Sequence, residues 1–443
     1  MTEKQNIQRE PLVRLAKRDD LSGGKKWAIR LGAIVLALVV GSLFIAVLGH
    51  NPIAVYHDII TGSLGGPSTA KVTVRVAIPL LGAALAIAPA FKMKFWNIGA
   101  EGQIMVGGIA ATYFALYWYD KLPKPALLIV MAVASILAGG IWGLVPAFCK
   151  ARWGTNETLF TLMLNYIAIG IEAYLQNGPW KDPSGTGFPI IAMFDQKARL
   201  PKVGGVHIGW IIVLALTVGM FIYMKYSKHG YEISVVGESQ RTARYAGMNV
   251  GKIIMRTMFL SGAIAGLMGF LVVSGADYTL NNGTSGGVGF TAIIVAWLAH
   301  LNPFAMVLIA GLLAVLTKGS NTIQTNFKIP ASAADVLSAI ILFFMLGCEF
   351  FINYRMIFRG SKAKVPAGPA PATPAASPDT AEKEADEHEY PHHFPHRRHP
   401  GGGPAALRRA GRDADGEIRQ HEPGRRGHDV HGRHRRHPRP LLL

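Results

Sequence analysis

Long apolar blocks, separated by short polar connections, follow one another along the chain up to about residue 355. They lack the 3.6-residue alternation of apolar and polar positions that marks a helix on the surface of a soluble protein. Blocks of this length and composition are typical of helices that cross or enter a membrane. The pattern predicts an all-α polytopic membrane protein with about ten transmembrane or re-entrant helices, near residues 31–48, 74–91, 98–118, 125–148, 158–175, 208–224, 257–275, 288–301, 304–317 and 334–353.

Lysine and arginine are unevenly distributed over the connections. Connections on one predicted side of the membrane hold 22 of these residues, and the remaining connections hold 10. Because positive charge is favoured on the inner side, the richer set, with both termini, is predicted to be cytoplasmic. The richer set comprises residues 1–30, 92–96, 150–156, 225–256 and 354–365, and the outward set includes 50–73, 176–206 and 276–287.

Composition supports a membrane protein, because half of the 443 residues are apolar and only 16% are charged. The formal net charge of +18 could indicate nucleic-acid binding, but 13 of the 45 Lys and Arg residues follow residue 365 and most others flank apolar blocks. The charge therefore reflects membrane topology and an unusual tail, and no nucleic-acid partner is predicted. Cys149 and Cys348 lie in separate blocks and support neither a disulfide framework nor a metal site.

Changes in composition divide the chain into three regions. Residues 1–30 are predicted to be a cytoplasmic segment, residues 31–360 the transmembrane domain, and residues 361–443 a disordered tail. Ten of the fifteen histidines lie between His388 and His437, which leaves metal binding as one interpretation of the tail. Our other hypothesis is that the chain from about His388 is an out-of-frame translation of a downstream gene for a related membrane subunit, which the DNA sequence would decide.

The stretch Lys92–Gly108 interrupts two apolar blocks with polar side chains and glycines. Asn97, Glu101 and Gln103 are predicted to lie here at membrane depth, where a carboxylate is costly and commonly faces a cavity or a partner. These residues are therefore candidates for the lining of a translocation path. The alternative is structural, with Asn97 as the cap of the next helix and Glu101 near its positive N-terminal end.

A second polar pattern begins the block near residue 158. Glu157, Thr161 and Asn165 follow one another at four-residue steps, so a helix would place them on one face. Such a stripe indicates either a path lining or contacts between helices. Asn156 as a cap and Glu157 at the helix N-terminus would explain those two residues but not Thr161 and Asn165.

The internal loop 225–256 contains a run of small residues mixed with arginines. The run can form a short helix with a docking face, ended by Gly247, or a solvated loop whose arginines only fix the topology. The residues concerned are Glu238, Arg241, Ala243, Arg244, Tyr245, Ala246, Gly247 and Met248.

Motifs for nucleotide binding are incomplete in this chain. Leu21–Lys25 is similar to part of an ATPase signature but precedes the first apolar block, and Gly247–Lys252 is one residue shorter than a phosphate loop. No plausible hydrolytic set of residues is apparent. The sequence therefore predicts a protein that is not an enzyme and that has no cofactor of its own.

Four segments in colinear order resemble bacterial ABC-importer permeases, and especially nucleoside permeases within the branched-chain amino acid and simple-sugar permease family. The resemblance covers about residues 30–360 and is carried by Phe95–Gln103, Asn156–Tyr166, Ala243–Met248, and Gly289–Ala296 with Asn302-Pro303.

The resemblance implies a multi-pass subunit of a bacterial inner-membrane importer for a nucleoside or similar small polar solute. It implies a second related permease, a cytoplasmic ATPase that binds ATP and Mg²⁺, and an extracytoplasmic substrate-binding lipoprotein. It also implies that Arg241–Met248 docks on the ATPase. Asn97, Glu101, Gln103, Glu157 and Asn165 are then expected to line or brace the path. The alternative function is a carrier driven by an ion gradient, with Glu101 or Glu157 as the proton site.

Overall fold

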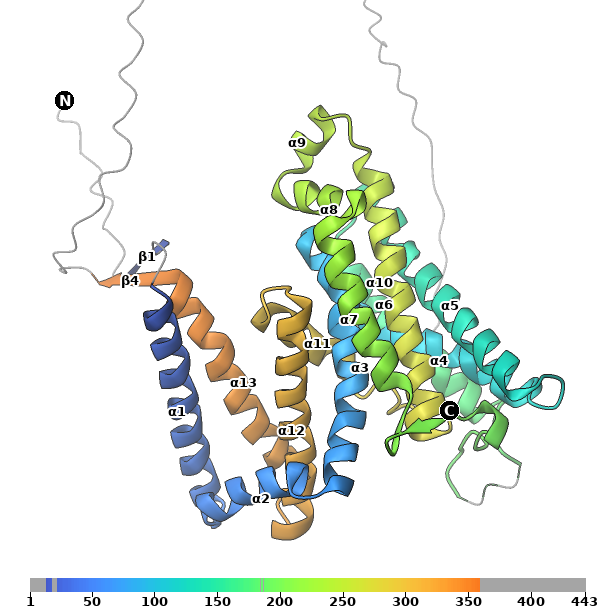
Figure 1. The fold of residues 1–443 in the computed structure, drawn as a ribbon, viewed down its shortest axis with the longest axis horizontal. Helices are drawn as coiled ribbons and strands as arrows, with labels where there is room; N and C mark the ends of the chain where they lie inside the picture. Colours follow the sequence, from blue (N-terminus) through green and yellow to red (C-terminus); the bar gives the residue numbers. More distant parts are fainter. Residues whose placement is uncertain (1–12, 18–21, 184, 186, 359–443) are drawn as a thin grey trace, which may run out of the picture. The chain divides into compact units, whose positions relative to one another are not determined.

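The structure, a computed structural model, describes residues 13–17, 22–183, 185 and 187–358 (Figure 1). The predicted disordered tail, with its histidine run and the hypothesis of an altered reading frame, lies outside the described residues. The long helices are α1 (Gly23–Val47), α2 (Pro52–Leu64), α3 (Pro67–Lys92), α4 (Ala100–Tyr117), α5 (Lys124–Trp153), α6 (Glu157–Asn177), α7 (Gly209–Tyr226), α10 (Val250–Val272), α12 (Pro303–Phe327) and α13 (Ala331–Asn353). The shorter elements are α8 (Lys228–Glu238), α9 (Gln240–Tyr245), α11 (Val288–Leu298), the 3₁₀ turn η1 (Gln196–Ala198), the π-helical turn η2 (Val273–Asp277), β1 (Val13–Lys17), β2 (Lys202–Val203), β3 (Val206–His207) and β4 (Tyr354–Phe358).

The helices confirm an all-α polytopic membrane fold, and every predicted apolar block falls on a helix. Among the described residues, seven helices are long and apolar enough to cross a membrane. There are up to eight if α1 and α2, which are bent by 112° against each other, form one broken span. The predicted number of about ten is therefore approximate. Helix α11 has 11 residues, which extend about 16 Å and cannot cross a hydrocarbon core of about 30 Å.

Helix α10 is the centre of the fold, because it packs against α3, α4 and α5. Two glycine pairs with four-residue spacing, Gly139 and Gly143 on α5 and Gly262 and Gly266 on α10, bring these helices into backbone contact. A Cβ atom on Gly266 would overlap the carbonyl oxygen of Ser135, and a Cβ atom on Gly262 would overlap that of Gly139. Small residues at such positions let van der Waals packing hold membrane helices together.

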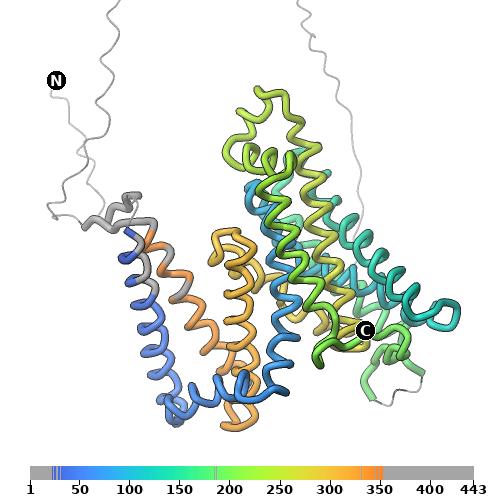
Figure 2. Tube along the Cα trace, in the orientation of Figure 1, coloured from blue at the N-terminus to red at the C-terminus, as the bar shows by residue number. Residues whose placement is uncertain are grey.

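The two ends of the membrane domain lie on the same side. Strand β1, before the first helix, pairs antiparallel with β4, after the last one, with Val13 opposite Phe358. Helices α1 and α13, which carry these strands, pack side by side (Figure 2). This pairing agrees with the predicted even number of crossings, whereas the cytoplasmic side itself remains a prediction from charge.

We expect Gly266→Val to disrupt the packing of α10 on α5, because the new side chain meets backbone atoms that cannot move independently. The expected loss of folding free energy is at least about 1–3 kcal/mol. Gly170→Ala on α6 is the matched control, since a Cβ atom there meets nothing within 4 Å. Thermal unfolding of detergent-purified protein measures both. Equal melting temperatures for Gly266→Val and the wild type would contradict this packing.

Candidate functional site

The chain breaks its helical path between α3 and α4. Helix α3 ends at Lys92 and α4 begins at Ala100, and Lys94 between them adopts a left-handed backbone conformation with φ of 59°. A break of this kind leaves backbone N–H and C=O groups without helical partners. At membrane depth such groups must be paired within the protein.

Side chains of the break, of α4 and of α10 form a buried polar cluster. The side-chain amides of Asn97 and Gln103 exchange two hydrogen bonds of 3.3 Å, and Asn97 Nδ2 also donates to Ser261 Oγ at 3.1 Å. Asn97 Oδ1 accepts a bond from the N–H of Gly99 at 3.0 Å. Asn97 is therefore held by both its own turn and the central helix.

Helix α6 pairs with the backbone of the break from the other side. The N–H of Ile98 donates to Thr161 Oγ1 at 3.3 Å, and Asn165 Nδ2 donates to the carbonyl of Ile98 at 2.9 Å. Asn165 Oδ1 accepts a bond from the N–H of Gly102 at 2.8 Å. The predicted shared face of Thr161 and Asn165 thus meets the backbone of the break.

Glu101 binds the start of the re-entrant helix α11. Its carboxylate oxygens accept hydrogen bonds from the N–H groups of Gly287 at 2.8 Å and Gly289 at 2.7 Å. A carboxylate at a helix N-terminus pairs with unsatisfied N–H groups and is favoured by the helix dipole. Glu101 is 3% exposed, so this contact explains how a buried carboxylate is satisfied. A Cβ atom on Gly289 would clash with the backbone of Glu101, so the close approach requires glycine.

Glu157 lies apart from this cluster. Its carboxylate forms an ion pair of 2.7 Å with Lys150 Nζ on α5. Asn156 caps α6 by accepting bonds from the N–H groups of Thr158 and Leu159. The structure therefore brings together five of the six candidate residues, Asn97, Glu101, Gln103, Thr161 and Asn165, each at most 3% exposed, and separates Glu157 from them.

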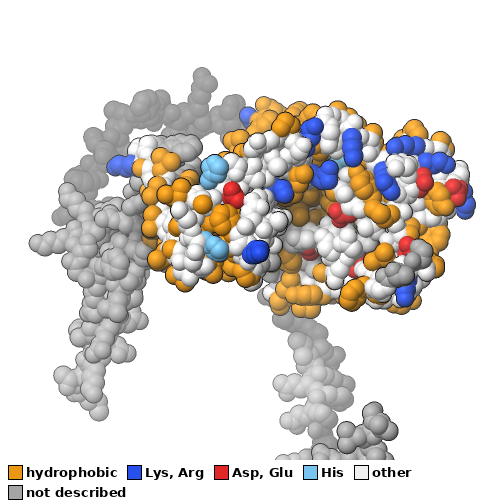
Figure 3. All heavy atoms as spheres, turned by 90° about the horizontal axis from the view of Figure 1, so that it is seen from below, with side chains coloured by type: hydrophobic (Ala, Val, Ile, Leu, Met, Phe, Trp, Pro, Cys, Tyr) orange, Lys and Arg blue, Asp and Glu red, His pale blue; other side chains and the backbone are white. Residues whose placement is uncertain are grey.

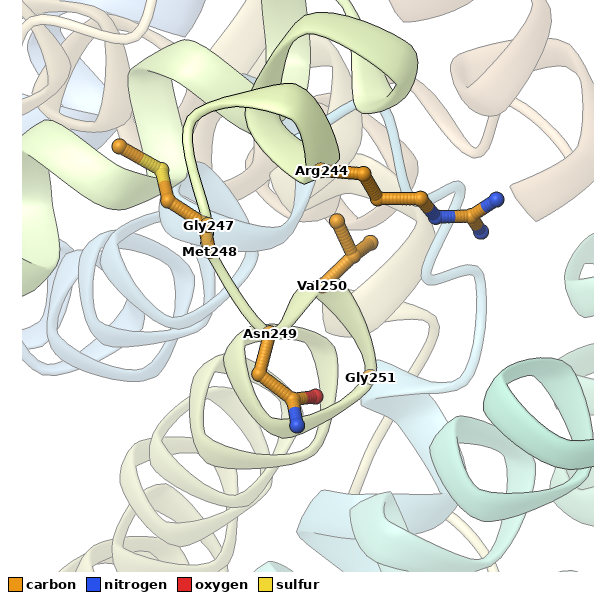
Figure 4. Close-up of a pocket in the computed structure, with 6 residues that line it drawn as sticks. All are labelled: Arg244, Gly247, Met248, Asn249, Val250 and Gly251. Carbon is orange, nitrogen blue, oxygen red and sulfur yellow. The ribbon is translucent and has the colours of Figure 1, made fainter. Parts of the chain in front are cut away.

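The predicted docking run begins at Glu238, the last residue of α8, and continues through α9 to the turn before α10. Ala243 is buried, whereas Arg241, Arg244 and Tyr245 are exposed, Tyr245 at 93%. The remaining residues of the run are Glu238, Ala246 and Gly247, which are exposed, and Met248, which is half-buried. An open hollow next to this run is lined by Arg244 and residues 247–251 (Figure 4).

Helix α8 packs directly on the end of α3. Gly237 lies against the carbonyl oxygen of Lys92, in a contact that leaves no room for a Cβ atom. Beneath it, Met93 and Phe95 share a buried apolar cluster with Ile233 and Val236 of α8. The exposed run is therefore connected through packed side chains to the break between α3 and α4.

Comparison with known proteins identifies the family. Residues 69–346 match the family model described as branched-chain amino acid transport system / permease component. The chain belongs to this permease family. The glucose ABC transporter permease protein TsgB13 of Haloferax volcanii is 32% identical, over 73% of this chain and 88% of its own length. The guanosine ABC transporter permease protein NupP of Bacillus subtilis is 33% identical, over 72% and 92%. The nucleoside ABC transporter permease protein NupB of Lactococcus lactis is 30% identical, over 74% and 93%.

The permease assignment confirms the resemblance found in the sequence. It makes the chain a multi-pass membrane subunit of a transport system. The roles of the individual side chains remain predictions, because family membership does not assign them. The structure shows in addition that Phe95–Gln103, one of the segments that carry the resemblance, is hydrogen-bonded to Asn165.

An aromatic group flanks the break of the permease. The indole rings of Trp96 and Trp297 stack with centroids 5.7 Å apart and planes 20° apart, and Phe91 lies behind both. Each indole is nearly half exposed, at 45% and 44%. The end of α11 is thereby tied to the same segment whose Glu101 binds its beginning.

Several polar residues of the permease were not singled out from the sequence. Ser261 has no distinguishing signal, because one serine in an apolar block is common. Arg75 and Glu172 could have been recognised from the sequence, since each is a charged residue inside a predicted apolar block. Both carboxylate oxygens of Glu172 are buried without a hydrogen-bond partner among the described residues.

We expect Glu101→Ala to lower the stability of the permease, because the N–H groups of Gly287 and Gly289 lose their acceptor. A buried unpaired donor costs about 1–3 kcal/mol. Glu101→Gln keeps one acceptor oxygen and should lose less. Glu157→Gln is the control, since its ion pair is partly exposed and worth at most about 1 kcal/mol. Thermal unfolding in detergent measures the relative stabilities of the three variants. A Glu101→Ala protein as stable as the control would contradict the capping role.

Proposed function

We propose that the chain is the membrane subunit of an ATP-driven importer that moves a nucleoside or similar small polar solute into the cell. Relatives named for guanosine, nucleosides and glucose support this solute class. The observation that carries the proposal is a continuous series of contacts. It runs from the exposed α8–α9 run through Gly237 and Lys92 to the break, and through Glu101 to α11.

The series gives a physical route for coupling. ATP binding and hydrolysis on a partner ATPase can drive transport only if they favour one facing state of the permease over the other. The exposed side chains of Arg241, Arg244 and Tyr245 offer the ATPase a surface, and ATP with its Mg²⁺ is held by that partner. Movement of α8 would be passed to Lys92, Met93 and Phe95, which α8 touches directly, and from them along the chain to Glu101.

A second permease subunit is part of the proposal. Helix α11 is too short to cross the membrane, and such an element is tolerated only where protein or a water-filled cavity covers it. One side of α11 is exposed in this chain, where the side chains of Phe290 and Trp297 are 43% and 44% exposed. A related permease facing this side, with the path between the two, would cover it. An extracytoplasmic binding protein would deliver solute, and the assembly would lie in the inner membrane of a bacterium.

On this proposal five of the candidate residues brace the path rather than contact solute. Asn97, Gln103, Thr161 and Asn165 hold the break, and Glu101 holds α11. Glu157 would lie near the cytoplasmic mouth, where its pair with Lys150 joins α5 to α6.

We expect the double variant Arg241→Glu, Arg244→Glu to lose the ATPase partner while still inserting in the membrane, because both side chains are exposed and none of the described core depends on them. ATPase retained on affinity-purified permease should fall at least about tenfold, the effect of about 1.4 kcal/mol. Lys181→Glu, exposed in an outward loop, is the matched control. Wild-type recovery of ATPase with the double variant would show that α9 is not the docking surface.

The energy source is tested with the complete assembly in proteoliposomes. Accumulation of radiolabelled adenosine or glucose should require ATP on the ATPase side and should survive collapse of proton and sodium gradients by ionophores. A carrier driven by an ion gradient would instead accumulate solute without ATP and would stop when the gradients collapse. Accumulation that needs a gradient and ignores ATP would refute the importer.

A further inference from the structure

Three buried polar atoms without partners lie where α3, the β2–β3 hairpin and η2 join. They are Nε of Arg75, Nδ1 of His207 and Oγ of Ser274, and none has a hydrogen-bond partner among the described residues. His207 is 2% exposed and Ser274 is fully buried. Buried polar groups are normally paired, so unpaired groups on three neighbouring elements call for an explanation.

The imidazole of His207 is fixed in this junction by two glycines. A Cβ atom on Gly209 or on Gly275 would lie 2.6 Å from Nδ1 of His207. Ser274 precedes Gly275 in η2, and its carbonyl accepts a bond from the N–H of Leu200, which anchors the segment leading to the hairpin. The ring therefore packs on Gly275 of η2, the residue that follows Ser274.

Charged groups of the junction are nearly balanced. The Arg75 guanidinium lies close enough to act electrostatically on both His207 and Asp277, and the hydroxyl of Thr284 approaches the Asp277 carboxyl. Burial, assisted by Arg75, lowers the pKa of His207 to about 4, so its imidazole is neutral at physiological pH. Arg75, Asp277 and neutral donors and acceptors are thus assembled, with the Lys71 ammonium beside the same hairpin.

The junction lies toward the end of the permease away from α8. Arg75 and Lys92 are 17 residues apart on α3, which is about 26 Å along the helix axis. The face seen from below in Figure 3, opposite α8 and α9, is hollowed near its middle, with Lys and Arg side chains around the hollow. Lys71, which touches Gly205 of the hairpin, belongs to the same end of α3.

The chemistry of the junction selects among ligands. An anion would meet the carboxylate of Asp277, and a cation would meet the guanidinium of Arg75. A hydroxyl group both donates and accepts, so it can pair with a neutral imidazole nitrogen and with a serine hydroxyl at once. Charged residues at membrane depth, moreover, commonly mark a solute pathway.

We infer that this junction binds hydroxyl groups of the transported solute, such as those of a sugar ring, at the end of the path opposite the ATPase. The inference rests on the proposed import function and adds a residue set to it, Arg75, His207, Ser274 and Asp277. The site recognises the hydroxylated part of the solute and is indifferent to an attached base.

The test uses the complete assembly in proteoliposomes and compares adenosine with 2′,3′-dideoxyadenosine. Ser274→Ala removes a hydroxyl that has no partner in the described chain, so it should leave folding intact. We expect the adenosine concentration that gives half-maximal uptake to rise about fivefold, which is the effect of losing one neutral hydrogen bond. The corresponding concentration of the dideoxy compound should stay unchanged. The binding protein is the same in every sample, so a change in the ratio reports on the permease. His207→Phe should act in the same direction.

Ser320→Ala on α12 is the matched control, because Ser320 is also buried with an unpartnered hydroxyl but lies outside the junction. Ser320→Ala should leave the half-saturating concentration of both compounds unchanged. If the assembly transports D-glucose instead, the comparison is made with 2-deoxy-D-glucose.

The inference is overturned if Ser274→Ala matches the control, if it affects both compounds equally, or if only its melting temperature changes, which would indicate a structural water only. Wild-type assembly without any ATP-dependent uptake would instead refute the proposed function, and the inference with it.

Discussion

The structure depends on one constraint: backbone N–H and C=O groups at membrane depth must find partners within the protein. Two places where the core departs from regular α-helix are the break between α3 and α4 and the beginning of α11. Asn165 binds the carbonyl of Ile98 in the break and the N–H of Gly102 in the first turn of α4, and Glu101 binds two N–H groups at the start of α11. Without these side chains both departures would leave unpaired groups. The break and the re-entrant helix therefore exist because side chains from outside them complete their hydrogen bonding.

The same constraint explains what the sequence could and could not predict about the site. Polar residues within or beside apolar blocks led to Asn97, Glu101, Thr161 and Asn165 as candidates for a path lining, a role that stays a prediction, and the structure places all four at or next to the break. The four-residue spacing also predicted that Thr161 and Asn165 would act together. It could not reveal that their partner is the backbone of a segment about 60 residues earlier, because a backbone group has no signature in the sequence. Glu157 has the same spacing but contacts Lys150, a difference that depends on where α5 ends.

The helices were more predictable than their ends. Hydropathy located every long helix except α2, which lies in the predicted outward connection 50–73. The predicted block 304–317 became α12, which continues to Phe327. Its later turns are polar and pack through Gly319 and Thr322 on α2, so hydropathy falls while the helix continues. The junction of Arg75, His207 and Ser274 was missed for a related reason. It draws single residues from three distant segments, and no periodicity connects them.

Helix α3 joins the proposed solute site to the proposed ATPase-docking region. Helix α3 has Arg75 near its beginning and Lys92, against Gly237 of α8, at its end. It continues into the break, whose Glu101 fixes α11. A ligand at either end can bias the permease only by its different affinity for the two facing states. Because α3 packs on both α10 and α11, a displacement at Lys92 cannot be absorbed locally without disturbing buried contacts. Solute at the junction and nucleotide on the partner would then act on the same equilibrium, which is the condition for coupling them without direct contact.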